Sequence, residues 1–127
     1  MKTKLVNIER HSSKTASINV IEVLKTLNFE AKRIFYIHNE FKNEIRGRHA
    51  HRKCIQFLIP LLGEFEIYCN DGSNEKSYIL NDPSKGLLIP PMIWSKQTYK
   101  NEKNILLVIA SEEYEENDYI YNINELV

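Results

Sequence analysis

Short stretches rich in β-branched, leucine and aromatic residues, separated by turn residues, most constrain how this chain can fold. The clearest covers residues 64–69, where Phe65, Ile67 and Cys69 alternate with more polar neighbours. Alternation with a period of two residues predicts a β-strand with one buried face. Turn-forming residues flank this stretch on both sides. Six further stretches have the same character: 18–24, 32–37, 54–61, 76–80, 86–89 and 105–110.

These stretches together predict an all-β fold, an antiparallel sandwich or small barrel. Two segments compete as helices. Residues 19–28 contain too many β-branched residues for a helix, and we interpret the acidic stretch 112–118 as a solvated tail that packs its tyrosines. The chain has 127 residues and no internal repeat or low-complexity linker, so we expect a single domain over residues 1–127.

The charge balance and the distribution of apolar residues exclude several classes of protein. Seventeen basic and seventeen acidic side chains provide no general attraction to nucleic acid or to a membrane surface. No apolar run approaches the roughly 18 to 20 residues that cross a bilayer, and the first residues lack the apolar centre of a signal peptide. We therefore expect a cytoplasmic protein, in which Cys54 and Cys69 are packed thiols.

Positive charge is concentrated between residues 46 and 53. Three of the five arginines, Arg46, Arg48 and Arg52, lie in this run, and no acidic residue interrupts it. The planar fork of donors on arginine suits phosphate or carboxylate. The run predicts a local site for an anionic ligand, although a solvated basic loop has the same composition.

Two histidines, His49 and His51, lie within the basic run. On a strand, residues two apart point to the same face, about 6 to 7 Å from each other, so both imidazoles can act on one ligand. Imidazole titrates near pH 6.5, which suits proton transfer at neutral pH. We interpret the isolated His11 and His38 as surface residues.

The histidine pair begins a spacing that resembles the first cupin motif. Four residues separate His51 from Gln56, and six more lead to Gly63, while residues 86–95 resemble the second motif. In metal-binding cupins the positions of Gln56 and Ser95 hold glutamate and histidine. Amide and hydroxyl groups are poor ligands for iron, manganese or zinc. The resemblance therefore implies a jelly-roll antiparallel β-barrel of the cupin type that binds no metal.

A longer set of motifs resembles the nucleotide-sugar 3,4-ketoisomerases, RmlC-like cupins. The matching segments are 32–37, RGRHAHRK at 46–53, GLLIPP at 86–91 with Trp94, 108–111 and 114–120. The likeness extends from about Leu5 to the C-terminus. It implies conversion of dTDP-4-keto-6-deoxyglucose into a dTDP-3-keto-6-deoxyhexose without a cofactor, for 3-amino sugars of bacterial surface glycans. It also implies a homodimer with an exchanged N-terminal strand.

The resemblance implies that His49 and His51 are the catalytic pair. Moving a ketone from C4 to C3 requires removal of a proton from C3 and return of a proton to C4, so two neighbouring acid/base groups are needed. The residues do not decide which histidine serves which carbon. Arg46 and Tyr36 are the candidates for stabilising the enediolate oxygen.

Five further residues are candidates for binding the substrate. Arg33, Arg48 and Lys53 are the candidates for the pyrophosphate. Gln56 occupies a former ligand position inside the barrel, where it can hydrogen-bond a sugar hydroxyl. Trp94 is a candidate for an apolar wall of the pocket, with plain core packing as the alternative.

Three alternatives remain open. A related cupin epimerase would leave the ketone at C4, a non-catalytic sugar-nucleotide-binding cupin would bind without turnover, and a metal-dependent oxygenase is disfavoured by Gln56 and Ser95. The sequence departs from the family pattern at residues 15–17, Phe35, Ser95 and Tyr121. These departures leave the product configuration at C4, gluco or galacto, open.

Overall fold

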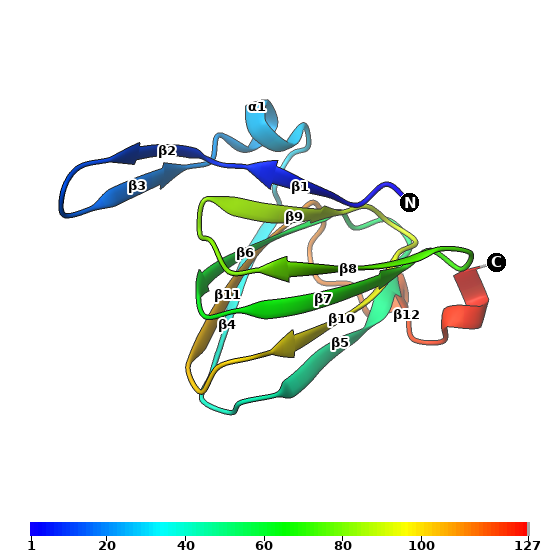
Figure 1. The fold of residues 1–127 in the computed structure, drawn as a ribbon. Helices are drawn as coiled ribbons and strands as arrows, with labels where there is room; N and C mark the ends of the chain where they lie inside the picture. Colours follow the sequence, from blue (N-terminus) through cyan, green and yellow to red (C-terminus); the bar gives the residue numbers. More distant parts are fainter. Residues whose placement is uncertain (127) are drawn as a thin grey trace.

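Two five-stranded antiparallel sheets face each other in the computed structural model, which describes residues 1–126 (Figure 1). The first sheet has the strand order β1-β9-β6-β11-β4, and the second has the order β12-β5-β10-β7-β8. The strands are β1 (Lys4–Asn7), β2 (Glu9–Ser12), β3 (Ser17–Val20), β4 (Arg33–Asn39), β5 (Glu44–His51), β6 (Gln56–Leu62), β7 (Phe65–Asn70), β8 (Glu75–Leu80), β9 (Lys85–Ile89), β10 (Trp94–Tyr99), β11 (Asn104–Ala110) and β12 (Tyr119–Ile120). The predicted all-β, antiparallel jelly-roll architecture is confirmed.

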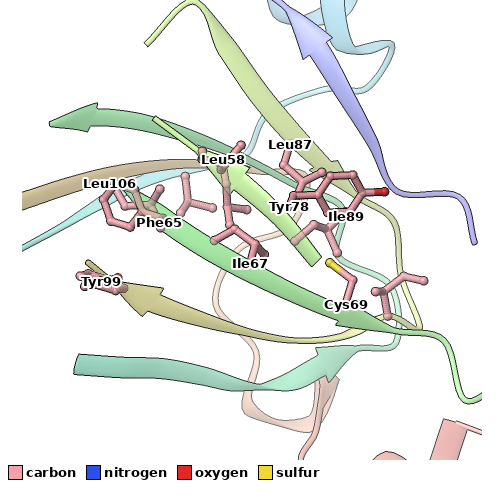
Figure 2. Packing of buried hydrophobic residues seen from close by; sticks show 12 residues of the cluster. Leu58, Phe65, Ile67, Cys69, Tyr78, Leu87, Ile89, Tyr99 and Leu106 are labelled. Atoms are coloured by element: carbon pink, nitrogen blue, oxygen red, sulfur yellow. The ribbon is translucent and has the colours of Figure 1, made fainter. Parts of the chain in front are cut away.

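The main core lies between the two sheets (Figure 2). From β7, the alternating residues Phe65, Ile67 and Cys69 are fully buried, as the period of two predicts. From the first sheet, Leu58 and Leu106 pack against them. Each such side chain is expected to contribute about 1.5 to 3 kcal/mol on burial, so this layer fixes how the two sheets face each other.

Strand β6 is apolar without alternation because both of its faces are covered. Leu58 belongs to the core between the sheets, while Phe57 and Ile59 belong to a second cluster on the other face of the first sheet. Leu27 and Phe29, which lie in and just after the helix α1 (Val23–Leu27), complete that cluster. A strand buried on both faces is expected to be hydrophobic on both, which explains why apolar residues follow one another without alternation after Gln56.

The predicted strand at 18–24 is only partly correct. Strand β3 ends at Val20, and the helix α1 begins at Val23 and ends where Asn28 adopts a left-handed backbone (φ 60°). Burial of Leu27 overrides the weak helix propensity of the segment. The predicted solvated tail at 112–118 is also only partly correct, because the 3₁₀ helix η1 (Glu116–Asp118) ends in a buried aspartate.

The strands β2 and β3 form a hairpin that projects from the barrel (Figure 1). All its side chains are exposed except Val20, which is partly buried, and 65% of the surface of Ile18 is accessible. At the other end of the chain, the 3₁₀ helix η2 (Ile123–Leu126) follows β12. No helix among residues 1–126 has the length and apolar character needed to span a membrane.

Candidate functional site

The paired histidines lie at the end of β5, beyond an irregularity in its pairing with β10. The register slips between His49, which pairs with Ser95, and Gly47, so Arg48 is the extra residue of a β-bulge. Gly47 (φ 92°) and Arg48 (φ 62°) both have left-handed backbone conformations. Beyond the bulge, His49 and His51 share the inner face of the barrel with the buried Ser95.

The two imidazole rings are in contact. Their centroids lie 4.9 Å apart and their planes are nearly perpendicular, at 89°, closer than the strand spacing alone predicts. Nδ1 of His49 donates to the carbonyl oxygen of Gly47 at 3.1 Å. Nδ1 of the buried His51 lies 3.3 Å from Oδ2 of Asp118, at ion-pair distance but out of hydrogen-bond alignment. Nε2 of His51 is buried with no hydrogen-bond partner within residues 1–126.

Burial lowers the pKa of both imidazoles. For His51 the pKa falls to about 4, because the ring has lost water and lies beside His49, while the Asp118 carboxylate acts in the opposite direction. For His49, burial lowers the pKa and the bond to the Gly47 carbonyl opposes it. Both rings are therefore neutral at pH 7, and each has one nitrogen with a free lone pair that can accept a proton.

A tyrosine and an arginine complete the inner wall around the imidazoles. Tyr119 pairs directly with His51 in the β12–β5 ladder, and its ring centroid lies 4.7 Å from that of His49 and 4.5 Å from that of His51. The pKa of Tyr119 is raised because the phenol is partly buried, and the Arg33 guanidinium opposes this rise. The Arg33 guanidinium lies 5.0 Å from the ring of Phe35, and its Nε is buried with no partner among the described residues. The same guanidinium also lowers the pKa of His51.

Two more of the predicted site residues face the inside of the barrel. Gln56 is buried and pairs across the first sheet with Ala110, which in turn pairs with Arg33, so Gln56 and Arg33 point to the same side. Arg46 pairs with Gln97 on the inner face of the second sheet, but its guanidinium is bound to Glu44 at 3.1 Å.

The structure does not bring Tyr36, Arg48, Lys53 or Trp94 to the histidines. Tyr36 follows the inward-facing Phe35, so the alternation of β4 points it outward, and it is 66% exposed. Arg48 is the exposed residue of the bulge.

Lys53 follows β5 and Trp94 begins β10, and neither side chain points into the barrel with the histidines. Lys53 lies, with Lys32 and Arg52, along an open cleft of about 640 Å³ whose other lining includes the acidic stretch from Glu112 to Asp118. Trp94 precedes the inward Ser95, and its Nε1 donates to the carbonyl of Tyr121 at 3.0 Å. The alternation of β10 therefore turns its indole away from the barrel interior, against Tyr121, whose ring centroid lies 6.3 Å from that of His49.

Sequence reasoning missed Asp118 and Tyr119. Asp118 is one acid in a stretch of five, and Tyr119 belongs to the segment 114–120 that resembles the family but has no distinguishing feature of its own. The one available signal was that Asp118 directly precedes Tyr119 and Ile120, which predicts a short buried strand after the acidic run. Both residues act on a segment more than 60 positions earlier in the chain, which no local pattern reveals.

The donor set around the histidines does not resemble a metal site. Within residues 1–126, no three side chains of His, Cys, Asp or Glu converge in a metal-binding group. Gln56 and Ser95, the remaining positions of the cupin motif, present an amide and a hydroxyl group. These residues fit hydrogen bonding to a sugar better than they fit coordination of a metal ion.

We expect the buried neutral state of His51 to make the protein less stable in mild acid. In the unfolded chain a histidine titrates near pH 6.5, whereas folded His51 titrates at about pH 4, so the unfolded chain takes up the proton first as the pH falls. The free energy of unfolding is therefore unaffected above about pH 7 and declines by roughly 2 kcal/mol between pH 7 and pH 5. Urea unfolding at the two pH values measures this difference.

The variant His51→Asn isolates the contribution of this ring. Its free energy of unfolding should depend less on pH over the same interval, because the asparagine side chain does not titrate. An identical pH dependence in the wild type and the variant would show that His51 is not held neutral by burial.

Comparison with known proteins gives consistent matches along the chain. The family model FdtA, described as "WxcM-like, C-terminal", matches residues 1–127. The TDP-4-oxo-6-deoxy-alpha-D-glucose-3,4-oxoisomerase of Aneurinibacillus thermoaerophilus is 32% identical over 120 residues, which cover 94% of this chain and 86% of that protein. These matches extend over the whole barrel and are not limited to the histidine motif.

Solved structures give the same result. A 3,4-ketoisomerase from Helicobacter canadensis superposes with a TM-score of 0.93 at 40% identity, covering 99% of this chain and 95% of that one. A histidine-to-asparagine mutant of the 3,4-ketoisomerase QdtA from Thermoanaerobacterium thermosaccharolyticum, solved in complex with TDP-4-keto-6-deoxyglucose, has a TM-score of 0.92 at 36% identity, covering 98% and 90%.

Proposed function

The chain belongs to the FdtA family (WxcM-like, C-terminal), and from this membership we propose that it is an isomerase that converts dTDP-4-keto-6-deoxyglucose into a dTDP-3-keto-6-deoxyhexose. The observation that carries the proposal is the pair of neutral imidazoles, 4.9 Å apart on one face of β5. A ketone shift between neighbouring carbons needs removal of a proton from one carbon and return of a proton to the other, which two adjacent acid/base groups can perform. The same chemistry serves the synthesis of 3-amino sugars, and we place it in the cytoplasm.

The reaction oxidises C3 and reduces C4 of the same sugar, so it needs no external oxidant. One imidazole takes the proton from C3, the electrons of that bond form a C3–C4 double bond, and the C4 carbonyl oxygen takes up the negative charge. O4 then gains a proton and the O3 hydroxyl loses one. Finally C4 receives a proton from an imidazolium and O3 becomes the new carbonyl oxygen. His49 and His51 supply the proton acceptor and the proton donor.

We assign stabilisation of the enediolate to Arg33. Its guanidinium lowers the pKa of His51 and opposes the rise that burial causes in the pKa of Tyr119, and its buried Nε has no partner among the described residues. A positive group in a site shielded from water stabilises a developing negative charge strongly. Arg46 shares the inner face, but Glu44 already binds its guanidinium, and Tyr36 faces outward.

The remaining candidate substrate-binding residues differ in whether they face the interior of the barrel. Gln56, on the inner face, is suited to hydrogen-bond a sugar hydroxyl. Arg48 extends from β5 with an exposed side chain, and Lys53 lies on an open cleft, so these two remain proposals for the pyrophosphate. Arg46, which the sequence offers as a candidate for the enediolate, also has an exposed side chain on β5, and we now propose it for the pyrophosphate as well. We leave Trp94 out of the sugar pocket, because its indole points away from the barrel interior and donates to the carbonyl of Tyr121.

Incubation of the enzyme with dTDP-4-keto-6-deoxyglucose in deuterated water tests the proposal. The returned proton comes from a group that exchanges with solvent, so we expect a 3-keto product that carries deuterium at C4. NMR of the product gives the position of the carbonyl group and of the deuterium. A ketone that stays at C4 while other positions exchange would instead identify an epimerase, and binding without any exchange would identify a sugar-nucleotide-binding protein.

A chelator provides the control for metal involvement. Because Gln56 and Ser95 replace the carboxylate and imidazole of the metal-binding cupins, we propose that the reaction needs no metal ion. Turnover should be the same before and after treatment with a chelator and removal of the chelated ions. Loss of turnover that added metal restores would contradict this part of the proposal.

We also propose that the protein is a homodimer that exchanges its N-terminal strands. The projecting β2–β3 hairpin supports this, because a two-stranded hairpin without a covering layer is only marginally stable in water. The side chain of Ile18 is 65% exposed on this hairpin. A second copy of the chain would cover the hairpin and its open strand edges.

A further inference from the structure

The carboxylate of Asp118 lies behind one of the two imidazoles. We propose that Asp118 is a positioning residue for the isomerisation, which holds His51 with its proton on Nδ1 and leaves the Nε2 lone pair for the substrate. The inference rests on the proposed function above for its effect on turnover. Its effect on the resting imidazole is independent of any substrate.

Hydrogen bonds to the backbone hold Asp118 in position. Its Oδ1 accepts the backbone N–H of Lys53 at 2.8 Å, and its Oδ2 accepts that of Cys54 at 3.2 Å. Its own carbonyl accepts the N–H of Arg52 at 2.8 Å, and its N–H donates to the carbonyl of Glu115 at 3.0 Å. Two backbone N–H groups hold the two carboxylate oxygens in place. The chain thus presents a rigid negative charge at the end of β5.

This charge faces one nitrogen of His51. Oδ2 of Asp118 lies 3.3 Å from Nδ1, and the side chains are only 7% and 9% exposed for His51 and Asp118 respectively. An ionised carboxylate can only accept hydrogen bonds, so the neutral ring is stabilised with its hydrogen on Nδ1. Such contacts are often loose without substrate and tighten during catalysis.

The other ring nitrogen of His51 carries the free lone pair. Nε2 is buried, lacks a partner within residues 1–126, and lies on the side of the ring away from Asp118. The charged and titratable groups that face His51 are His49 on its own strand, Arg33 on β4, Tyr119 on β12 and Asp118 on η1. Of these, only Asp118 is a carboxylate. It is therefore the one neighbour that stabilises the imidazolium formed when Nε2 takes a proton from the sugar.

The two histidines are consequently held by unlike groups. Nδ1 of His49 donates to the neutral carbonyl of Gly47, whereas Nδ1 of His51 faces a carboxylate. The backbone carbonyl orients a ring, but the carboxylate also compensates positive charge on it. Removal of Asp118 should therefore change the protonation of His51 and leave that of His49 nearly unchanged.

The first test is ¹⁵N NMR of the imidazoles in the resting wild-type protein. We expect His51 as the neutral tautomer with hydrogen on Nδ1. In Asp118→Asn, whose amide can donate as well as accept, the preference for this tautomer should weaken. A wild-type His51 with its hydrogen on Nε2 would overturn the proposal even if no variant folded. It would leave the ketoisomerase assignment untouched, since that depends on product analysis.

The second test is turnover of Asp118→Asn and Asp118→Glu. We expect kcat to fall about 10- to 100-fold in Asp118→Asn, with KM little changed and with partial recovery in Asp118→Glu. The acid limb of the profile of kcat/KM against pH should move to lower pH in Asp118→Asn, because the negative charge that supported protonation of His51 is gone. If the substitution instead loosened the site in general, water would reach His51, and the acid limb would move to higher pH, toward the ordinary pKa of histidine.

Asp71→Asn provides a matched control. Asp71 also accepts two backbone N–H groups, from Ser73 at 2.9 Å and from Asn74 at 2.7 Å, in the turn between β7 and β8. This variant loses a comparable turn carboxylate, so it should keep the wild-type kcat and pH profile. Equal losses of kcat in Asp71→Asn and Asp118→Asn, or an Asp118→Asn enzyme with the wild-type kcat and pH profile, would overturn the positioning role.

Discussion

Replacement of either His49 or His51 by asparagine lowers kcat for ketoisomerisation by about 10² to 10⁴-fold, the usual cost of losing one general acid/base group. Asparagine keeps a polar side chain of similar reach but cannot take up a proton at neutral pH. The two rings lie in contact (4.9 Å between centroids), so each variant leaves the other imidazole as the one remaining histidine of the pair. Steady-state rates with dTDP-4-keto-6-deoxyglucose measure the loss.

Binding should survive these substitutions, which separates a chemical role from a structural one. A histidine-to-asparagine mutant of QdtA was solved in complex with TDP-4-keto-6-deoxyglucose, so such a change is compatible with substrate binding in a relative. Calorimetric titration with thymidine diphosphate should give affinities within a few-fold of the wild type. His38→Asn, an exposed histidine on β4, is the control and should keep full activity.

The two variants also show which histidine serves C3 and which serves C4. A variant that has lost only the group that serves C4 should still exchange the C3 hydrogen with deuterated water, although it forms little product. A variant that has lost the group for C3 should do neither. If both His49→Asn and His51→Asn keep near-normal rates, the assigned mechanism is wrong even though the fold is right.

The strands of the core could be predicted because their pattern is local. Phe65, Ile67 and Cys69 alternate, and β7 follows the alternation residue by residue. The continuous apolar run that became β6 could be predicted as a strand, but not the reason for its composition, which is the second cluster that includes Leu27. That cluster also explains why the helix α1 forms in a segment that favours extended structure.

The candidate site was predictable in its residue types and less so in its geometry. The spacing of His49 and His51 predicts a shared face, and they share one. Their separation and the direction of Arg48 depend on a bulge with left-handed backbone at a non-glycine residue, which has no sequence signature. The position of Asp118 depends on hydrogen bonds to residues 64 and 65 positions away.

The bulge itself supports the second large prediction, that Gly47→Val lowers kcat by about 10²-fold. Gly47 has φ 92°, and a Cβ there would lie 3.1 Å from the backbone oxygen of Ser95 and 3.4 Å from Cα of Lys96. A β-branched residue at positive φ is strained, and both neighbours are backbone atoms of β10, so β5 must move. The Gly47 carbonyl also holds Nδ1 of His49. A displacement of about 1 Å at a reacting group can cost 10²-fold in rate.

Gly63→Val separates displacement of the site from general strain. Gly63 has nearly the same backbone conformation (φ 94°), and a Cβ there would meet Oδ1 of Asn104 at 2.6 Å, in a turn remote from the imidazoles. Both variants should lose about 1 to 3 kcal/mol of unfolding free energy, but only Gly47→Val should lose kcat once both are folded. Single-turnover rates on the folded fraction make this comparison. If the two variants lose kcat equally, or if Gly47→Val retains the wild-type kcat, the β-bulge does not set the position of His49 relative to the substrate.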